Sequence, residues 1–141
     1  LECIAEGDNE LVFRDFSHAP SKAAATVNAV RDQFPQRYFL SVFELHTYSS
    51  LQPDFMEGYK GLFDAADAAW VLYDPHVFEL KRMPIPSVEE MQQRLGNVVL
   101  FNDPKALESA LKEWRADTQA HERKIVSLWM SSGNFGGVKI V

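Results

Sequence analysis

The chain has 141 residues, the usual size of a single domain with one core. Its apolar content of 46% and charged content of 24% are typical of globular proteins and exclude a disordered chain. A net charge of −6 argues against binding to nucleic acid or to a membrane surface, because both need a concentrated basic face. No apolar run approaches the roughly 18 residues of a membrane-spanning helix and no leader is evident, so we expect a cytoplasmic domain.

The first 35 residues predict a hairpin followed by a helix. Gly7-Asp8-Asn9 is a turn sequence between two short strands that together span Leu1 to Phe16. Pro20 suits the first turn of a helix, and apolar residues recur after it at helical spacing until Pro35.

Strand and helix patterns alternate through the rest of the chain. Buried strands are predicted at residues 38–43, 69–73, 98–101 and 125–130. Helices are predicted at residues 55–66, at 88–95 with Ser87 and Glu90 as a capping box, and from Pro104 behind Asp103 as cap. This order predicts an α/β, Rossmann-like three-layer domain: a mostly parallel sheet of about six strands, helices on both faces and an N-terminal hairpin. We expect residues 1–141 to be one domain.

Ligands bind parallel sheets beyond the carboxyl ends of the strands, and polar residues gather in four segments at such positions. The segments are residues 15–18, 44–50, 74–76 and 131–137. Asp15 and His18 lie where a strand gives way to a helix, whose amino terminus favours phosphate or carboxylate, and an acidic side chain there can bind ribose hydroxyls. Equally, Asp15 could cap the helix or brace the loop, and His18 could be held within the turn.

Three glycines in the segment 132–137 allow a ligand to approach the backbone, although the segment is neither a P-loop nor a GxGxxG fingerprint. We expect no metal site, because the histidines are isolated and Cys3 is the only cysteine. No nucleophile motif is present, and no residue is assigned a catalytic role.

The run Asp15-Phe16-Ser17-His18-Ala19-Pro20 resembles the Asp-(Tyr/Phe)-Ala-His-x-Pro signature that opens the third domain of Mur ligases. Phe43-Glu44-Leu45-His46-Thr47-Tyr48-Ser49 is similar to the segment after the second core strand of that domain. Within this family, Glu44 and residues 130–137 look most similar to the branch that recycles muropeptides. The next most similar branch is the one that adds alanine.

The resemblance implies the C-terminal domain of an ATP-dependent amide ligase of peptidoglycan biosynthesis or recycling. Such a domain closes over ATP and binds the amino acid or peptide that attacks an acyl phosphate of a UDP-N-acetylmuramate substrate, with Mg2+ on the phosphates. Asp15 and His18 would then be nucleotide-binding. Glu44, His46, Tyr48, Asn134 and Gly136 would be substrate-binding, although Tyr48 and Asn134 could equally brace their loops.

The central ATPase domain and the amino-terminal UDP-binding domain of this family are absent from the chain, so we expect the isolated fragment to be inactive. Thr47 and Ser50 stand where the alanine-adding branch has arginines, which leaves open how the acceptor's carboxylate is bound and whether the amine is an amino acid or a tripeptide. The alternative is a non-catalytic Rossmann-like module that binds a nucleotide or peptide.

Overall fold

A six-stranded sheet forms the centre of the molecule, in the order β1-β2-β6-β3-β4-β5. The computed structural model describes residues 1–47 and 49–141. The strands are β1 (Glu2–Glu6), β2 (Glu10–Asp15), β3 (Tyr38–Leu45), β4 (Ala68–Tyr73), β5 (Val99–Phe101) and β6 (Ile125–Met130). β1 runs antiparallel to β2 and the other neighbours are parallel, which confirms the predicted hairpin and mostly parallel sheet.

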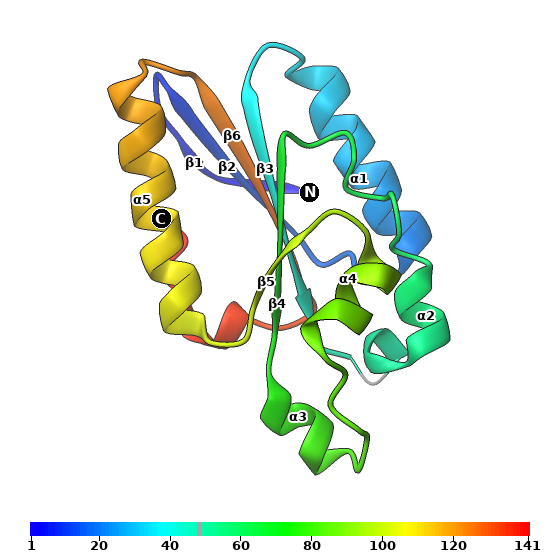
Figure 1. Cartoon of the computed structure of the whole chain (residues 1–141). Coiled ribbons are helices and arrows are strands. Elements are labelled where there is room, and N and C mark those ends of the chain that lie inside the picture. Colours follow the sequence, from blue (N-terminus) through cyan, green and yellow to red (C-terminus); the bar gives the residue numbers. More distant parts are fainter. Residues whose placement is uncertain (48) are drawn as a thin grey trace.

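Helices cover both faces of the sheet, as predicted for a three-layer domain. Figure 1 shows α1 (Pro20–Gln33), α2 (Pro53–Glu57) and α4 (Val88–Leu95) on one face and α5 (Pro104–Ala120) on the other. Alternate residues of β3 serve the two layers: Phe43 packs in the core beneath α1, and Val42 in the core beneath α5. Every residue of β6 is buried, as expected of a central strand covered on both faces.

The predicted caps are present at two of these helices. The Ser87 hydroxyl accepts a hydrogen bond from the amide of Glu90 at 3.2 Å, and the Asp103 carboxylate accepts one from the amide of Lys105 at 3.2 Å. Each bond satisfies an amide that the first helical turn leaves without a partner, which fixes where α4 and α5 begin.

The prediction of one helix across residues 55–66 is wrong in extent. α2 ends at Glu57, and the amides of Gly58, Tyr59 and Lys60 then bond to carbonyls three residues back, as in consecutive turns. Gly61 follows with a φ of +78°, a conformation that does not continue a helix. Tyr59 and Phe63 are nevertheless buried, because turns can present apolar residues to a core at the same spacing as a helix.

A short helix that the sequence pattern did not predict follows β4. α3 spans Pro75–Leu80, and the Asp74 carboxylate accepts a hydrogen bond from the amide of His76 at 2.9 Å. Asp74 as cap with Pro75 at the first helical position was the available signal. Six residues are too few for helical periodicity to show.

Candidate functional site

The described residues of the four polar segments do lie at the carboxyl edge of the sheet. Asp15 pairs with Met130 at the ends of β2 and β6, Met130 with Phe43 of β3, and Leu45 of β3 with Tyr73 of β4. Parallel pairing brings these strand ends to one edge, so segments separated by more than 80 residues in sequence become neighbours there.

The candidate nucleotide and substrate residues lie at this edge but on opposite faces of the sheet. Asp15 faces α1, where its Oδ2 accepts a hydrogen bond from the Thr26 hydroxyl at 3.3 Å. Glu44 faces the other layer and contacts the segment after β6. Successive side chains of a strand point to opposite faces of the sheet, so the position of each residue in its strand places Asp15 on one face and Glu44 on the other.

Glu44 holds the segment after β6 in place. Its Oε1 accepts a hydrogen bond from the Ser131 hydroxyl at 2.5 Å and one from the amide of Phe135 at 3.1 Å. The Ser131 hydroxyl oxygen in turn accepts a hydrogen bond from the amide of Gly133 at 2.7 Å. Within residues 1–47 and 49–141, Oε2 of Glu44 has no hydrogen-bond partner. One carboxylate oxygen is therefore structural, and the other is open to a ligand.

Two further contacts fix the same segment. Arg14 of β2 donates from Nη2 to the carbonyl oxygen of Gly133 at 2.8 Å. A Cβ on Gly133 would lie 3.0 Å from Oε1 of Glu44 and from the His46 ring, so glycine permits this close approach. Gly136 has a φ of +62°, and a Cβ there would lie 2.6 Å from Cγ of Pro104. The segment 131–137 is thus anchored to β2, to β3 and to the start of α5.

These contacts enclose a small cavity of about 150 Å³ at the carboxyl edge. Four of the predicted substrate residues line it, namely Glu44, His46, Asn134 and Gly136. Asp74 and Val77 line it from the region after β4, and Pro104 from the start of α5. The cavity therefore combines two carboxylates, an imidazole and an amide, a set that suits a small polar group carrying positive charge.

Asp15 braces the loop between β2 and α1. Its Oδ1 accepts hydrogen bonds from the Ser17 amide at 2.7 Å and the Ser17 hydroxyl at 2.6 Å. Partial burial raises the pKa of Asp15, but hydrogen bonds from the hydroxyl and the amide of Ser17 act in the opposite direction, and the pKa lies below its ordinary value. The loop-bracing alternative is what the structure shows, and a ribose contact stays a prediction.

His18 has an exposed ring at this edge. Its Nδ1 lies 3.2 Å from the carbonyl oxygen of Phe16, and its own carbonyl oxygen accepts a hydrogen bond from the Tyr59 hydroxyl. Burial raises the pKa of Tyr59, so the hydroxyl remains a donor. The backbone of His18 is therefore fixed, while the ring faces solvent beside the amino terminus of α1.

Of the predicted substrate residues, Tyr48 lies outside the described residues. Its neighbours Thr47 and Ser50 bond to each other: the Ser50 hydroxyl donates to the carbonyl of Thr47 at 2.8 Å. The structure also adds Arg14 and Pro104, which the sequence reasoning missed. Arg14 stands next to Asp15, and a positive charge directly after the apolar run Leu11 to Phe13 was the available signal.

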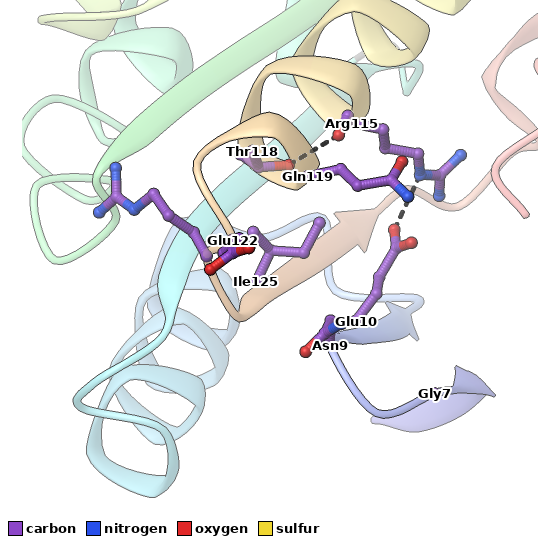
Figure 2. A pocket seen from close by; sticks show the side chains of 9 residues that line it. Gly7, Asn9, Glu10, Arg115, Thr118, Gln119, Glu122 and Ile125 are labelled. Carbon is purple, nitrogen blue, oxygen red and sulfur yellow. Dashed lines mark hydrogen bonds and ion pairs between the residues drawn. The ribbon is translucent and has the colours of Figure 1, made fainter.

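A larger cavity, of about 620 Å³, lies at the opposite edge of the sheet. Figure 2 shows Glu10, at the start of β2, and Arg115, on α5, pointing toward one another across it. Nε of Arg115 and Oε1 of Glu10 form an ion pair at 2.8 Å. This cavity lies by the amino ends of β2 and β6, away from the edge where parallel sheets bind ligands, and its central charges already pair with each other.

Two further properties concern the described part of the chain. Among these residues, no group of three or more His, Cys, Asp or Glu side chains could hold a metal ion. None of the described helices has both the length and the apolar content needed to cross a membrane.

Similarity to known proteins bears on the class of the domain. No protein-family model matches the chain. UDP-N-acetylmuramate–L-alanine ligase of Sulfurihydrogenibium sp. is 32% identical over 115 residues, which covers 77% of this chain and 24% of that protein. The protein of the same name from Coxiella burnetii is 31% identical over 90 residues, covering 64% of this chain and 18% of that protein. The chain thus spans a quarter or less of these curated relatives.

Solved structures share the fold along nearly the whole chain. A domain assigned to a UDP-N-acetylmuramate:L-alanyl-γ-D-glutamyl-meso-diaminopimelate ligase of Haemophilus ducreyi superposes with a TM-score of 0.61 at 24% identity, covering 98% of this chain and 92% of that one. A murein peptide ligase of Psychrobacter arcticus gives a TM-score of 0.64 at 16% identity, covering 97% of this chain and 27% of that one. The doubly covered sheet with its polar carboxyl edge is a Rossmann-like α/β domain of the kind found in ligases. The chain belongs to the Mur ligase family.

Proposed function

We propose that the chain is the C-terminal domain of an ATP-dependent amide ligase and that it binds the incoming amine at the carboxyl edge of its sheet. The names of the curated relatives support an amide ligase acting on UDP-N-acetylmuramate. The chain covers a small part of those relatives but nearly all of the solved Haemophilus ducreyi domain, which supports a single domain of a longer enzyme.

The observation that carries the proposal is the 150 Å³ cavity, which gathers Glu44, His46 and Asn134 from segments about 90 residues apart. An amine is protonated near neutral pH and must lose a proton before it can attack an activated carbonyl. Oε2 of Glu44 and the carboxylate of Asp74 attract the ammonium form, and the His46 ring can accept the proton. Asn134 orients the amine through its amide.

We place the nucleotide at the same edge of the sheet, on the face that α1 covers. The exposed His18 ring lies beside the amino terminus of α1, where free amides favour an anion. Oδ1 of Asp15 already accepts two hydrogen bonds from Ser17, whereas Oδ2 accepts one side-chain hydrogen bond, from Thr26, so a ribose hydroxyl would bind at Oδ2. ATP supplies the phosphoryl group that activates the substrate carboxylate, and Mg2+ is assigned to the remainder of the enzyme.

The test uses the full-length enzyme with ATP, UDP-N-acetylmuramate and either L-alanine or the tripeptide L-alanyl-γ-D-glutamyl-meso-diaminopimelate. Phosphate release and the mass of the product report ligation. Glu44→Gln keeps the size of the side chain and removes its charge, so we expect kcat/KM for the amine to fall about tenfold or more. Glu113→Gln, on an exposed position of α5, is the matched control and should leave it unchanged.

Two outcomes would contradict the proposal. Absence of ligation with every amine, with nucleotide binding intact, would favour the non-catalytic binding module. Ligation by the isolated 141-residue chain would show that the remaining domains are not needed. On the nucleotide side, Asp15→Ala should raise KM for ATP; unchanged ATP kinetics, as in an Asp8→Ala control in the hairpin turn, would reject the ribose contact.

A further inference from the structure

The two edge strands of the sheet, β1 and β5, differ in how they are protected from pairing with a further strand. An edge strand leaves a row of backbone amides and carbonyls without a strand partner, and proteins discourage further pairing there with charges, prolines or bulges. β1 has Glu2 and Glu6 at its ends and a register shift between Cys3 and Ala5. These charges and the irregular register protect β1 from pairing with another strand.

β5 has none of these protecting features. Residues 96–102, which contain β5 and its flanks, include neither a charged residue nor a proline. β5 is the last strand of the sheet order, next to β4. Within the part of the chain that the structure describes, the backbone of Val99, Leu100 and Phe101 forms no hydrogen bond outside its pairing with β4. The outer side of β5 therefore presents backbone groups that can pair with another strand.

An apolar surface reaches this edge on the face of the sheet that α5 covers. Val99 is 52% exposed, and it pairs with Trp70 of β4, so both side chains point to this face. The Trp70 ring packs against Phe101 on one side, with ring centroids 5.4 Å apart, and against Trp114 of α5 at 6.4 Å. α5 begins only at Pro104, after β5 has ended, and Val99 stays exposed at the edge.

The sequence of β5 is complementary to itself when two copies run antiparallel. A two-fold axis at Leu100 places Val99 of one copy opposite Phe101 of the second copy, on the face of Trp70. The same axis places the two Leu100 side chains opposite each other on the other face. A β-branched side chain opposite an aromatic one is a favourable cross-strand pair, and the symmetry forms this pair twice. An unrelated strand would gain the backbone hydrogen bonds without these side-chain pairs.

Registers centred one residue away lose this match. With the axis at Phe101, Val99 would lie opposite Asp103 of the second copy, and with the axis at Val99, Phe101 would lie opposite Asn97. Both arrangements place an apolar side chain against a polar one. In the register centred on Leu100, Asp103 lies opposite Asn97 of the second copy, so no two like charges are directly opposed.

We propose that β5 binds the β5 strand of a second copy of the chain, antiparallel and centred on Leu100, so that the two sheets join edge to edge. Three strand residues from each copy form a small contact, which favours a weak dimer with a dissociation constant of about 10–100 μM. The antiparallel arrangement points the carboxyl edges of the two sheets in opposite directions. The dimer does not depend on the proposed ligase function.

Sedimentation velocity of the full-length protein, from about 1 to 200 μM, measures the equilibrium between monomer and dimer. Val99→Lys places an ammonium group against Phe101 of the second copy, and lysine is a residue that protects natural edge strands. We expect the dissociation constant to rise about tenfold or more. Because Val99 is more than half exposed, the variant should keep the thermal unfolding midpoint of the wild type.

Cys3→Lys is the matched control, because Cys3 is exposed on β1, the other edge strand. This variant should keep the dissociation constant of the wild type. A wild-type protein that is monomeric over the whole concentration range would overturn the proposal. A dimer that Val99→Lys leaves intact, or that Cys3→Lys weakens as much as Val99→Lys does, would overturn it too.

Disulfide formation tests the register. Directly opposed residues of antiparallel strands have Cα atoms about 4.5–5.5 Å apart, a separation that a disulfide spans. Leu100→Cys should therefore form a covalent dimer on mild oxidation, identified by mass spectrometry of the linked peptides. In Val99→Cys the two cysteines would lie on a diagonal about 7–8 Å apart, too far for a disulfide. Linkage through residue 99 and not through residue 100 would overturn the register.

Amide hydrogen exchange distinguishes a second copy from other occupants of this edge. Exchange at residues 98–102 should slow as the protein concentration rises through the dissociation constant. The same residues in Val99→Lys should exchange at one rate throughout the range. Protection that is independent of concentration in a monomeric protein would show that another domain of the same protein covers β5, and it would overturn the proposal.

Discussion

The Ser131 hydroxyl donates a hydrogen bond to Oε1 of Glu44 at 2.5 Å, which ties the end of β3 to the first residue after β6. The same hydroxyl oxygen accepts from the amide of Gly133, so one side chain joins a carboxylate to the backbone of the loop that lines the candidate amine cavity. Ser131 is buried and Glu44 is partly buried, which makes the contact sensitive to the loss of either partner.

Ser131→Ala should lower the free energy of unfolding by about 1–3 kcal/mol, because it leaves the Gly133 amide and one Glu44 oxygen with fewer partners. Urea titration followed by circular dichroism measures the change. Ser21→Ala, at an exposed position of α1, is the control and should stay within about 0.5 kcal/mol of the wild type. If Ser131→Ala changes the free energy of unfolding as little as the control does, this hydrogen bond contributes little to the stability of the fold.

Gly136→Ala and Gly137→Ala form a matched pair. Both residues have positive φ, of +62° and +85°, so both variants incur a backbone penalty of about 1 kcal/mol. At Gly136 the new Cβ would lie 2.6 Å from Cγ of Pro104, whereas at Gly137 no atom of the described residues would lie within 4 Å of it. We therefore expect Gly136→Ala to be the less stable by a further ~1–3 kcal/mol, measured by thermal unfolding. Equal losses would mean that the start of α5 can move aside.

Asp15 should contribute stability that depends on pH. Its pKa in the folded chain lies below the ordinary 3.8, so the unfolded chain binds the proton more tightly. The contribution is fully present above the unfolded pKa and is lost as the pH falls through the folded pKa. Asp15→Asn should therefore lower the free energy of unfolding near neutral pH. The variant should also lose less of its stability than the wild type as the pH falls from about 5 to 2. Urea titrations across this range measure it, with Asp8→Asn as a control; parallel curves for both variants would contradict the expectation.

Tyr59→Phe should loosen the loop before α1. The Tyr59 hydroxyl donates to the carbonyl oxygen of His18, and the variant leaves this partly buried acceptor without its partner while the ring packing stays. A stability loss of about 1–2 kcal/mol and faster amide hydrogen exchange at residues 16–18 are expected. Tyr38→Phe is the control, since no hydrogen bond from the Tyr38 hydroxyl is found within the described residues. Unchanged exchange would show that the loop is held by Asp15 alone.

Local signals in the sequence predicted most of the fold. Gly7-Asp8-Asn9, Pro20, Ser87 and Asp103 act within a few residues of themselves, so their turns and caps follow from local physical chemistry. Where the signal was short or ambiguous the prediction failed. The six residues of α3 carry no periodicity, and residues 58–66 satisfy helical spacing with turns because Gly61 leaves the helical conformation.

The sequence by itself also determined that polar residues follow the strands. Because the strands are parallel, these residues lie at one edge of the sheet. Tertiary structure alone decided which of them meet. Glu44 and Ser131 are 87 residues apart, and Arg14 and Gly133 are 119 apart, and they touch because β6 lies between β2 and β3. Asp15 and Glu44 point to opposite faces of the sheet. Which face each side chain takes depends on how its strand pairs with its neighbours, and no local sequence pattern specifies that pairing.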